Sequence, residues 1–144
     1  NKYDVGVITD GELGCNLAFN LSANGYSTVL YNTGLENMLR EEINEYVSGI
    51  QEMGILASTS AEMTVTAQKA KSYICYSRSS IYADEILKEL YELAEAQDII
   101  IDTCDANYQI TAKRCRLFEK KYVEYVGAGF SGTEVGALNG ASIM

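Results

Sequence analysis

Short runs rich in β-branched residues alternate along this chain with longer segments whose apolar residues recur at helical spacing. The runs predicted to be buried strands are residues 3–8, 27–32, 72–77, 98–103 and 123–128, with a further short strand expected at 55–57. The apolar stripes that predict intervening helices are Leu13, Leu17 and Leu21; Leu35, Leu39, Ile43 and Tyr46; and Ile86, Leu90, Leu93 and Ala94. Such alternation predicts an α/β fold, a doubly wound, mainly parallel sheet with helices on both faces.

Two more helices are indicated by polar residues. Thr59 and Glu62 have the spacing of a capping box ahead of a short helix over 60–70. A helix over roughly 107–121 carries five of the eleven cations of the chain: Lys113, Arg114, Arg116, Lys120 and Lys121. We interpret these cations as a solvated face, not as a binding patch, because they follow helical spacing.

The length and charge of the chain bound what it can bind. Its 144 residues, 47% of them hydrophobic, suit one domain, and no linker or repeat divides the sequence. The net charge of −9 argues against nucleic acid and anionic membranes as partners. The longest apolar stretches are a few residues, whereas a bilayer-spanning helix needs roughly 20. No secretory signal is visible at the start.

The chain has no histidine and four cysteines without a CxxC pair. The lack of histidine excludes His-based triads and imidazole acid–base chemistry. The cysteines are expected to be reduced, as in a cytoplasmic protein: Cys15, Cys75, Cys104 and Cys115. A thiolate zinc site would require isolated cysteines to converge in the fold, so we expect no metal site.

A glycine-containing turn, Thr9-Asp10-Gly11-Glu12-Leu13-Gly14, follows the first predicted strand. In a Rossmann-like domain this turn cradles a pyrophosphate, and its three glycines allow a tight turn, a close ligand approach and close helix packing. Gly11 and Gly14 supply the second and third, whereas Thr9 stands at the first. Asp10 and Glu12 can cap the free amides of the following helix, and in that role they would repel a pyrophosphate.

The residues after the second predicted strand normally select the cofactor. An acid there binds the ribose 2′-hydroxyl of NAD, and a nearby arginine accepts the 2′-phosphate of NADP. Asn32-Thr33-Gly34 offers neither, although Asn32 could hydrogen-bond a ribose. These residues alone leave the choice between NAD and NADP open.

Several further segments carry a more specific signal. They are Gly6-Val7-Ile8, Gly14-Cys15-Asn16-Leu17-Ala18-Phe19-Asn20, Asp98-Ile99-Ile100-Ile101-Asp102, Lys113-Arg114-Cys115-Arg116 and Gly129-Phe130-Ser131-Gly132-Thr133-Glu134-Val135-Gly136-Ala137. Together they resemble the N-terminal coenzyme-binding domain of 6-phosphogluconate dehydrogenase, the decarboxylating, NADP-dependent oxidoreductase of the pentose phosphate pathway. The resemblance covers essentially the whole chain, so residues 1–144 are expected to form a single dinucleotide-binding domain, closed by the segment 138–144.

The resemblance implies a site for a small-molecule nucleotide and a sugar acid. The residues it assigns to NADP, or NAD, are Thr9, Gly11, Leu13, Gly14, Asn32, Thr33, Ser77, Arg78 and Asp105; those it assigns to substrate are Asp105, Ser131, Gly132 and Thr133. Some positions depart from the family. Thr33 replaces its 2′-phosphate arginine, Asp105 replaces an asparagine that meets nicotinamide and substrate, and Thr103 and Cys104 replace glycines. These changes predict that the ligand is held weakly, differently or not at all.

The family's general base and acid, a lysine and a glutamate, lie on a following helical domain that also forms the dimer. We expect that domain to be absent from these 144 residues, so we assign no catalytic residue here and expect this domain alone to be inactive. Three functions remain open. The chain is the coenzyme domain of such an oxidoreductase, a degenerate binding or regulatory module without hydride transfer, or a scaffold for protein association.

Overall fold

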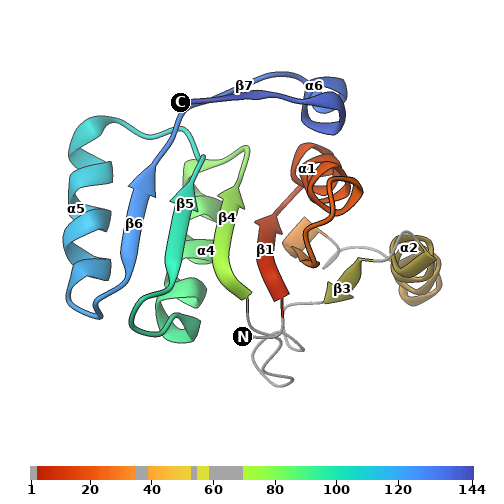
Figure 1. Cartoon of the computed structure of the whole chain (residues 1–144), viewed down its shortest axis with the longest axis horizontal. Helices are drawn as coiled ribbons and strands as arrows, with labels where there is room; N and C mark the ends of the chain where they lie inside the picture. Colours follow the sequence, from red (N-terminus) through yellow and green to blue (C-terminus); the bar gives the residue numbers. More distant parts are fainter. Residues whose placement is uncertain (1–2, 35–38, 53–54, 59–69) are drawn as a thin grey trace.

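A computed structural model describes residues 3–34, 39–52, 55–58 and 70–144 (Figure 1). In this part of the chain six strands form one sheet: β1 (Tyr3–Thr9), β2 (Thr28–Asn32), β3 (Leu56–Ser58), β4 (Ala70–Tyr76), β5 (Ile99–Asp102) and β6 (Glu124–Gly127). Their order is β3-β2-β1-β4-β5-β6, and every neighbouring pair is parallel. This is the predicted Rossmann-like sheet, and the short strand expected at 55–57 is present.

Helices cover both faces of the sheet because side chains alternate along each strand. The long helices of the described segments are α1 (Glu12–Ala23), α2 (Arg40–Glu52), α4 (Ser80–Leu93) and α5 (Tyr108–Glu119). Val7 and Leu30 point to one face and pack with Ala18 of α1 and Ile50 of α2. The next residues along the same strands, Ile8 and Tyr31, pack against the opposite face with α4 and with Phe118 of α5. The helix expected over 60–70, and Leu35, lie outside the described residues.

The last fifteen residues add a small unit that crosses above α1 (Figure 1). It consists of β7 (Phe130–Ser131), α6 (Glu134–Asn139) and β8 (Ser142–Ile143), and β7 and β8 pair antiparallel. The side-chain amides of Asn16 and Asn20 in α1 donate to the backbone oxygens of Glu134 and Leu138, at 2.9 and 2.8 Å. Ala137 is buried in the resulting contact. Within the described part of the chain, every helix is too short or too polar to cross a membrane.

The cations of α5 do not all face solvent. Lys113 and Arg116 of α5, and Lys120 just beyond it, are exposed, as predicted, whereas Lys121 is half-buried and donates to the Tyr91 carbonyl. For Arg114 the prediction is wrong, because this side chain is only 8% exposed and turns toward the sheet. Two carboxylates accept from its guanidinium, and ion pairing of this kind compensates the burial of a charge.

Gly6 sits in the middle of β1 for a packing reason. Its register partner in β4 is Tyr73, and a Cβ added at Gly6 would lie 2.8 Å from the Tyr73 ring. The glycine therefore leaves room for a large ring in the centre of the sheet. Tyr73 is fully buried, and its hydroxyl accepts from the Ala70 amide at 3.3 Å. Burial raises the pKa of Tyr73 to about 12.

The raised pKa of Tyr73 predicts a loss of stability in alkali. An unfolded tyrosine ionises near pH 10, so the contribution is complete below that pH and is lost between about pH 10 and 12. Urea unfolding should show the free energy of unfolding falling over this window. Tyr73→Phe should reduce the fall by up to about 2–3 kcal/mol, whereas Tyr26→Phe, at an exposed position, should leave it unchanged. Equal slopes in all three proteins would contradict this assignment.

Candidate functional site

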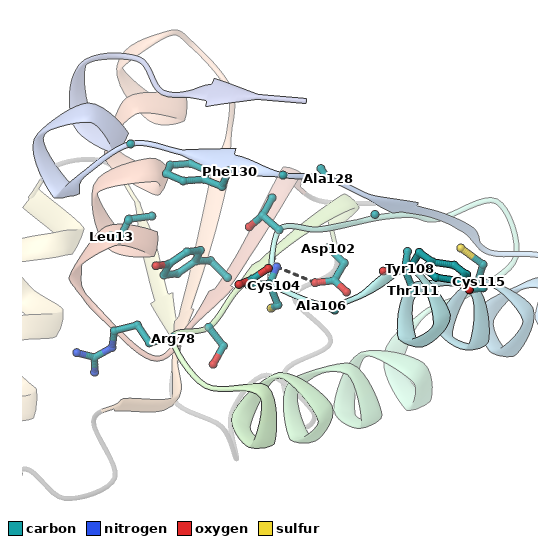
Figure 2. Close-up of a pocket in the computed structure, with 18 residues that line it drawn as sticks. Leu13, Arg78, Asp102, Cys104, Ala106, Tyr108, Thr111, Cys115, Ala128 and Phe130 are labelled. Atoms are coloured by element: carbon teal, nitrogen blue, oxygen red, sulfur yellow. Dashed lines mark hydrogen bonds between the residues drawn. The ribbon is translucent and has the colours of Figure 1, made fainter.

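A cavity of about 810 Å³ lies at the carboxyl ends of β4, β5 and β6 (Figure 2). The residues that line it are Leu13, Tyr76, Ser77, Arg78, Asp102, Thr103, Cys104, Asp105, Ala106, Tyr108, Thr111, Ala112, Cys115, Gly127, Ala128, Gly129, Phe130 and Gly132. Five of the residues that the sequence assigned to ligands are among them: Leu13, Ser77, Arg78, Asp105 and Gly132. This edge of a doubly wound sheet is where such folds bind ligands.

The remaining predicted residues lie elsewhere. Thr9, Gly11 and Gly14 surround the carboxyl end of β1. Asn32 ends β2, and Thr33 follows it. The other two belong to the C-terminal unit. Ser131 pairs with Ser142 between β7 and β8, and the hydroxyl of Thr133 caps α6 by accepting from the Gly136 amide at 3.3 Å. Some of the predicted ligand residues therefore line the cavity, whereas the others lie around the ends of β1 and β2 or in the C-terminal unit.

The turn after β1 is built around the Thr9 side chain. Its hydroxyl accepts from the Gly11 amide at 3.2 Å. A Cβ added at Gly14 would fall well inside van der Waals contact of the Thr9 side chain. Gly14 therefore performs the role of the third glycine, the close packing of helix on strand, against a threonine that stands where the first glycine is usual.

Asp10 does not bind the amides of α1, so it does not take the capping role that the sequence left open for it. Its carboxylate is buried and turns to the loop after β4, where it accepts from the Ser77 hydroxyl at 2.8 Å and the Arg78 amide at 3.3 Å. The Arg78 guanidinium lies 4.0 Å away. The N-cap of α1 is Gly11, without a side-chain hydrogen bond. The first amides of α1 therefore have no side-chain cap and are free to meet an anion, while Glu12 places an exposed carboxylate in the same turn.

The Arg78 side chain reaches across to the phosphate loop. Figure 2 shows it extending away from Cys104. Its Nε lies 3.2 Å from the position of a Cβ on Gly11, and its Nη2 donates to the Asp10 carbonyl at 3.5 Å. The side chain remains 71% exposed. The solvated guanidinium of Arg78 therefore lies over a loop whose charged residues, Asp10 and Glu12, are both acidic.

The loop after β2 is held by internal bonds. Asn32 Oδ1 accepts from the Gly34 amide at 2.9 Å, and its Nδ2 donates to the Tyr46 hydroxyl at 3.1 Å. The Thr33 hydroxyl donates to the Thr9 carbonyl at 3.3 Å. Both ends of the Asn32 amide have partners within the protein, so a ribose would have to compete with them.

The floor of the cavity contains a buried charge network that sequence reasoning missed. Asp102 Oδ2 accepts from Arg114 Nη1 at 2.9 Å and from the Tyr125 hydroxyl, and Oδ1 accepts from the Cys104 amide at 2.9 Å. Arg114 also donates to Asp84 at 2.7 Å. Burial lowers the pKa of Arg114, but the bonds to Asp84 and Asp102 outweigh it and raise that pKa. The available signal was an acid ending an apolar run, Ile99-Ile100-Ile101-Asp102, which demands a partner once buried.

The lining groups suit binding better than proton transfer. Among the described residues no lysine or glutamate lines the cavity, and Asp102 is neutralised by Arg114. Asp105 is exposed. Tyr76 and Phe130 supply an aromatic wall, with ring centroids 5.8 Å apart. The cavity can therefore hold a ligand with a flat apolar part and polar groups.

The Thr9–Gly14 contact predicts a steric coupling. Gly14→Ala should lower the free energy of unfolding by about 1–3 kcal/mol, because its Cβ overlaps Thr9. Thr9→Gly removes the obstacle, so the double variant should lose less than the two single losses added together. The control is Gly49→Ala in α2, where a Cβ meets nothing within 4 Å and should stabilise by up to about 1 kcal/mol. Additive losses in urea unfolding would show that the two sites do not touch.

The Asp102–Arg114 pair predicts a second coupling. Arg114→Met leaves a buried carboxylate without its cation and should cost about 3–5 kcal/mol. Adding Asp102→Asn removes the stranded charge and should recover part of that loss. Arg116→Met, on the exposed side of α5, is the matched control. A loss below about 1 kcal/mol for Arg114→Met would contradict the pairing.

Comparisons of the sequence and of the structure with known proteins point to the same family. The family model for the NAD binding domain of 6-phosphogluconate dehydrogenase matches residues 4–144. Decarboxylating 6-phosphogluconate dehydrogenases are similar: that of Haemophilus ducreyi is 32% identical over 145 residues, with 99% of this chain and 29% of that protein covered. That of Staphylococcus epidermidis is 30% identical over 141 residues, with 97% and 29% covered. The chain thus spans about 29% of the length of these relatives.

Solved structures agree with this result. The 6-phosphogluconate dehydrogenase of Plasmodium falciparum, solved apo and in complex with its cofactor NADP+ and its substrate 6-phosphogluconate, superposes with a TM-score of 0.76 at 28% identity, covering 98% of this chain and 30% of that one. The 3-hydroxyisobutyrate dehydrogenase of Mycobacterium tuberculosis shares the fold, with a TM-score of 0.75 at 15% identity over 99% of this chain and 46% of that one. The chain belongs to the family of NAD-binding domains of 6-phosphogluconate dehydrogenase.

Proposed function

We propose that this domain binds NADP in preference to NAD, as the coenzyme domain of a decarboxylating dehydrogenase that acts on a sugar acid. The observation that carries the proposal is the placement of Arg78. Asp10 holds this cation over the phosphate loop, at the side of the site where the dinucleotide's phosphates would lie.

The start of α1 supports binding of the pyrophosphate. The helix dipole and the free amides of a first turn favour an anion, and no side chain caps this turn. The charge of Asp10, which would oppose an anion, is met by the Ser77 hydroxyl and by Arg78. The carboxylate therefore positions a cation for the ligand and does not repel the ligand.

The preference for NADP follows from the loop after β2. The residues at the end of β2 and directly after it, Asn32-Thr33-Gly34, carry no carboxylate to bind the ribose 2′-hydroxyl of NAD, and the next acid, Glu36, lies outside the described residues. Arg78 Nη2 lies 3.5 Å from the Asp10 carbonyl oxygen. Gly34 approaches the same oxygen, because a Cβ added to it would lie 2.7 Å away. The guanidinium thus lies beside the loop that reads the ribose, where it can pair with a 2′-phosphate in place of the arginine that Thr33 replaces.

Activity of the whole protein would need residues beyond this domain. We propose that hydride transfer and decarboxylation occur only with the helical domain of the family, which would also provide the dimer contact and the acid–base groups. The cavity would hold the nicotinamide end and the sugar acid, with Asp105 and Gly132 near the substrate. Four free thiols suit the cytoplasm, where the pentose phosphate pathway runs.

A second candidate function is a binding or regulatory module without hydride transfer. The exposed carboxylate of Asp105 at the cavity favours it, because that charge would repel a phosphorylated sugar acid. Measurement of NADP binding distinguishes the two candidate functions. The coenzyme domain should bind NADP with a sub-millimolar dissociation constant, and the degenerate module should not.

Calorimetric titration of this chain with NADP and NAD tests the proposal. Arg78→Ala should weaken NADP binding by about tenfold to a hundredfold, since bonds between charged groups contribute about 1.5–3 kcal/mol. NAD, which lacks the 2′-phosphate, should lose less. Lys113→Ala removes the same charge from an exposed position on α5 and should change neither affinity by more than about twofold. Equal losses for NADP and NAD would refute the 2′-phosphate assignment, and unchanged NADP binding would refute any role for Arg78.

A further inference from the structure

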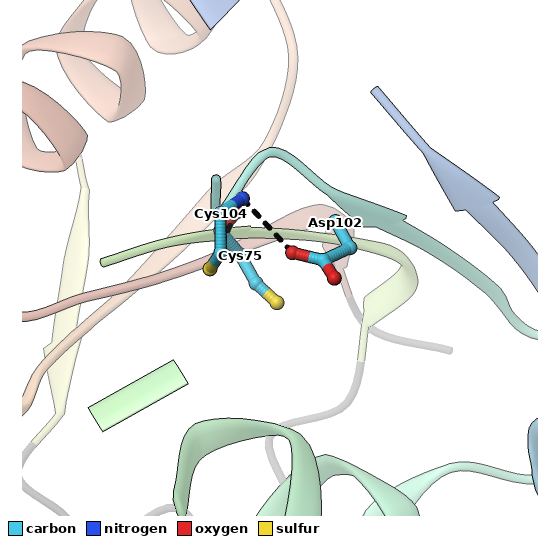
Figure 3. Close-up of side chains that lie close together, drawn as sticks. All are labelled: Cys75, Asp102 and Cys104. Carbon is cyan, nitrogen blue, oxygen red and sulfur yellow. Dashed lines mark hydrogen bonds between the residues drawn. The ribbon is translucent and has the colours of Figure 1, made fainter. Parts of the chain in front are cut away.

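Cys75 meets Asp102 and Cys104, which lie about 30 residues further along the chain, where the carboxyl ends of β4 and β5 lie side by side (Figure 3). Cys75 of β4 is the register partner of Asp102 of β5, and Cys104 follows two residues later. The parallel pairing of the two strands therefore sets the three side chains next to one another. The two sulfurs and a carboxylate oxygen all lie within 4.8 Å of each other.

We propose that Cys75, Cys104 and Asp102 form a binding site for one thiophilic divalent cation of the zinc type. The sequence analysis expected no metal site because the cysteines are isolated along the chain. The fold supplies the convergence that such a site requires.

The spacing of the three groups fits one ion. Zinc binds thiolate sulfur at about 2.3 Å and carboxylate oxygen at about 2.0–2.2 Å, so ligand atoms around one tetrahedral zinc lie roughly 3.5–4 Å apart. Atoms already within 4.8 Å of each other need only small side-chain rotations to reach that spacing. Two sulfur ligands favour zinc or cadmium over magnesium and calcium, which prefer oxygen.

The charge of the site also suits a divalent ion. Without an ion, Asp102 is already balanced by Arg114, so the two thiols are the groups that would lose protons when an ion binds. An ion that displaced both thiol protons would leave two thiolates, one carboxylate, one guanidinium and two positive charges on the metal. Two protons leave as two positive charges arrive, so the exchange adds no net charge to a buried region.

The surroundings orient the ligands and leave a route of entry. Asp102 is held by Arg114, Tyr125 and the Cys104 amide, which fix its carboxylate as bonds to a metal ligand do in established sites. Cys75 is 0% exposed and Asp102 is 2% exposed, but Asp102 and the 6% exposed Cys104 line the cavity. An ion would enter from the cavity, and its fourth position would face a water or a ligand oxygen there.

Titration of the reduced chain with Zn²⁺ and Cd²⁺ tests the site. Calorimetry should give one ion per chain, and Cd²⁺ should produce the ultraviolet absorption of a thiolate–cadmium bond. Cys104→Ser and Cys75→Ser should each weaken binding by at least about a hundredfold. Cys115→Ser is the matched control, because Cys115 lines the same cavity but lies outside the cluster. It should leave affinity and absorption unchanged.

A second measurement covers the case in which Cys75→Ser fails to fold. Mass spectrometry of the wild-type chain should show Zn²⁺ slowing alkylation of Cys104 by at least about tenfold while Cys115 reacts at its former rate. The proposal is overturned by the absence of a one-to-one complex, by binding that survives Cys104→Ser, or by equal protection of Cys104 and Cys115. None of these readouts requires NADP, so the result stands whether or not the proposed coenzyme binds.

Discussion

The junction between β1 and β4 is the constraint on which the rest of the molecule depends. These two strands share the centre of the sheet, and the helices that follow them leave toward opposite faces. The loops that follow the two strands meet through Asp10, which accepts from Ser77, and the cavity opens beside them at the carboxyl ends of β4, β5 and β6, near the switch point of this doubly wound sheet. Burial on both faces requires apolar residues in succession along β1, and Gly6 interrupts that run only to admit the Tyr73 ring.

Charge at this edge is arranged locally and does not follow the net charge of −9. Asp10 and Asp102, the two buried carboxylates at this edge, are each met by an arginine from another element. Asp10 of the first loop meets Arg78 after β4, and Asp102 of β5 meets Arg114 of α5. An unpaired carboxylate in either place would be costly to bury, so each pair ties two elements together as well as setting the local field. An acidic chain can in this way present a cation to a phosphorylated ligand.

The sequence allows prediction of elements whose signal is local. β-Branched runs identify the strands, and the glycine spacing identifies the turn after β1 together with the packing role of Gly14. Partners distant in sequence could not be predicted. Asp10 finds Ser77 and Arg78 through the pairing of β1 with β4. Nor does a predicted helix with several cations reveal that Arg114 is the one that faces the sheet. The meeting of Cys75 with Cys104 likewise depends on a register that no local pattern encodes.

Three loops at the carboxyl edge are braced against one another by bonds within the protein. Thr33 donates to Thr9, Gly34 lies against the Asp10 carbonyl, and Asp10 accepts from Ser77. A ligand would meet loops already in shape, so little of its binding energy would be spent on ordering them. The bracing also limits how such a site can diverge. A loop exchanged alone would break its bonds to both neighbours, so cofactor preference here would change by coordinated sets of loop residues, and single substitutions would meet resistance from the other two loops.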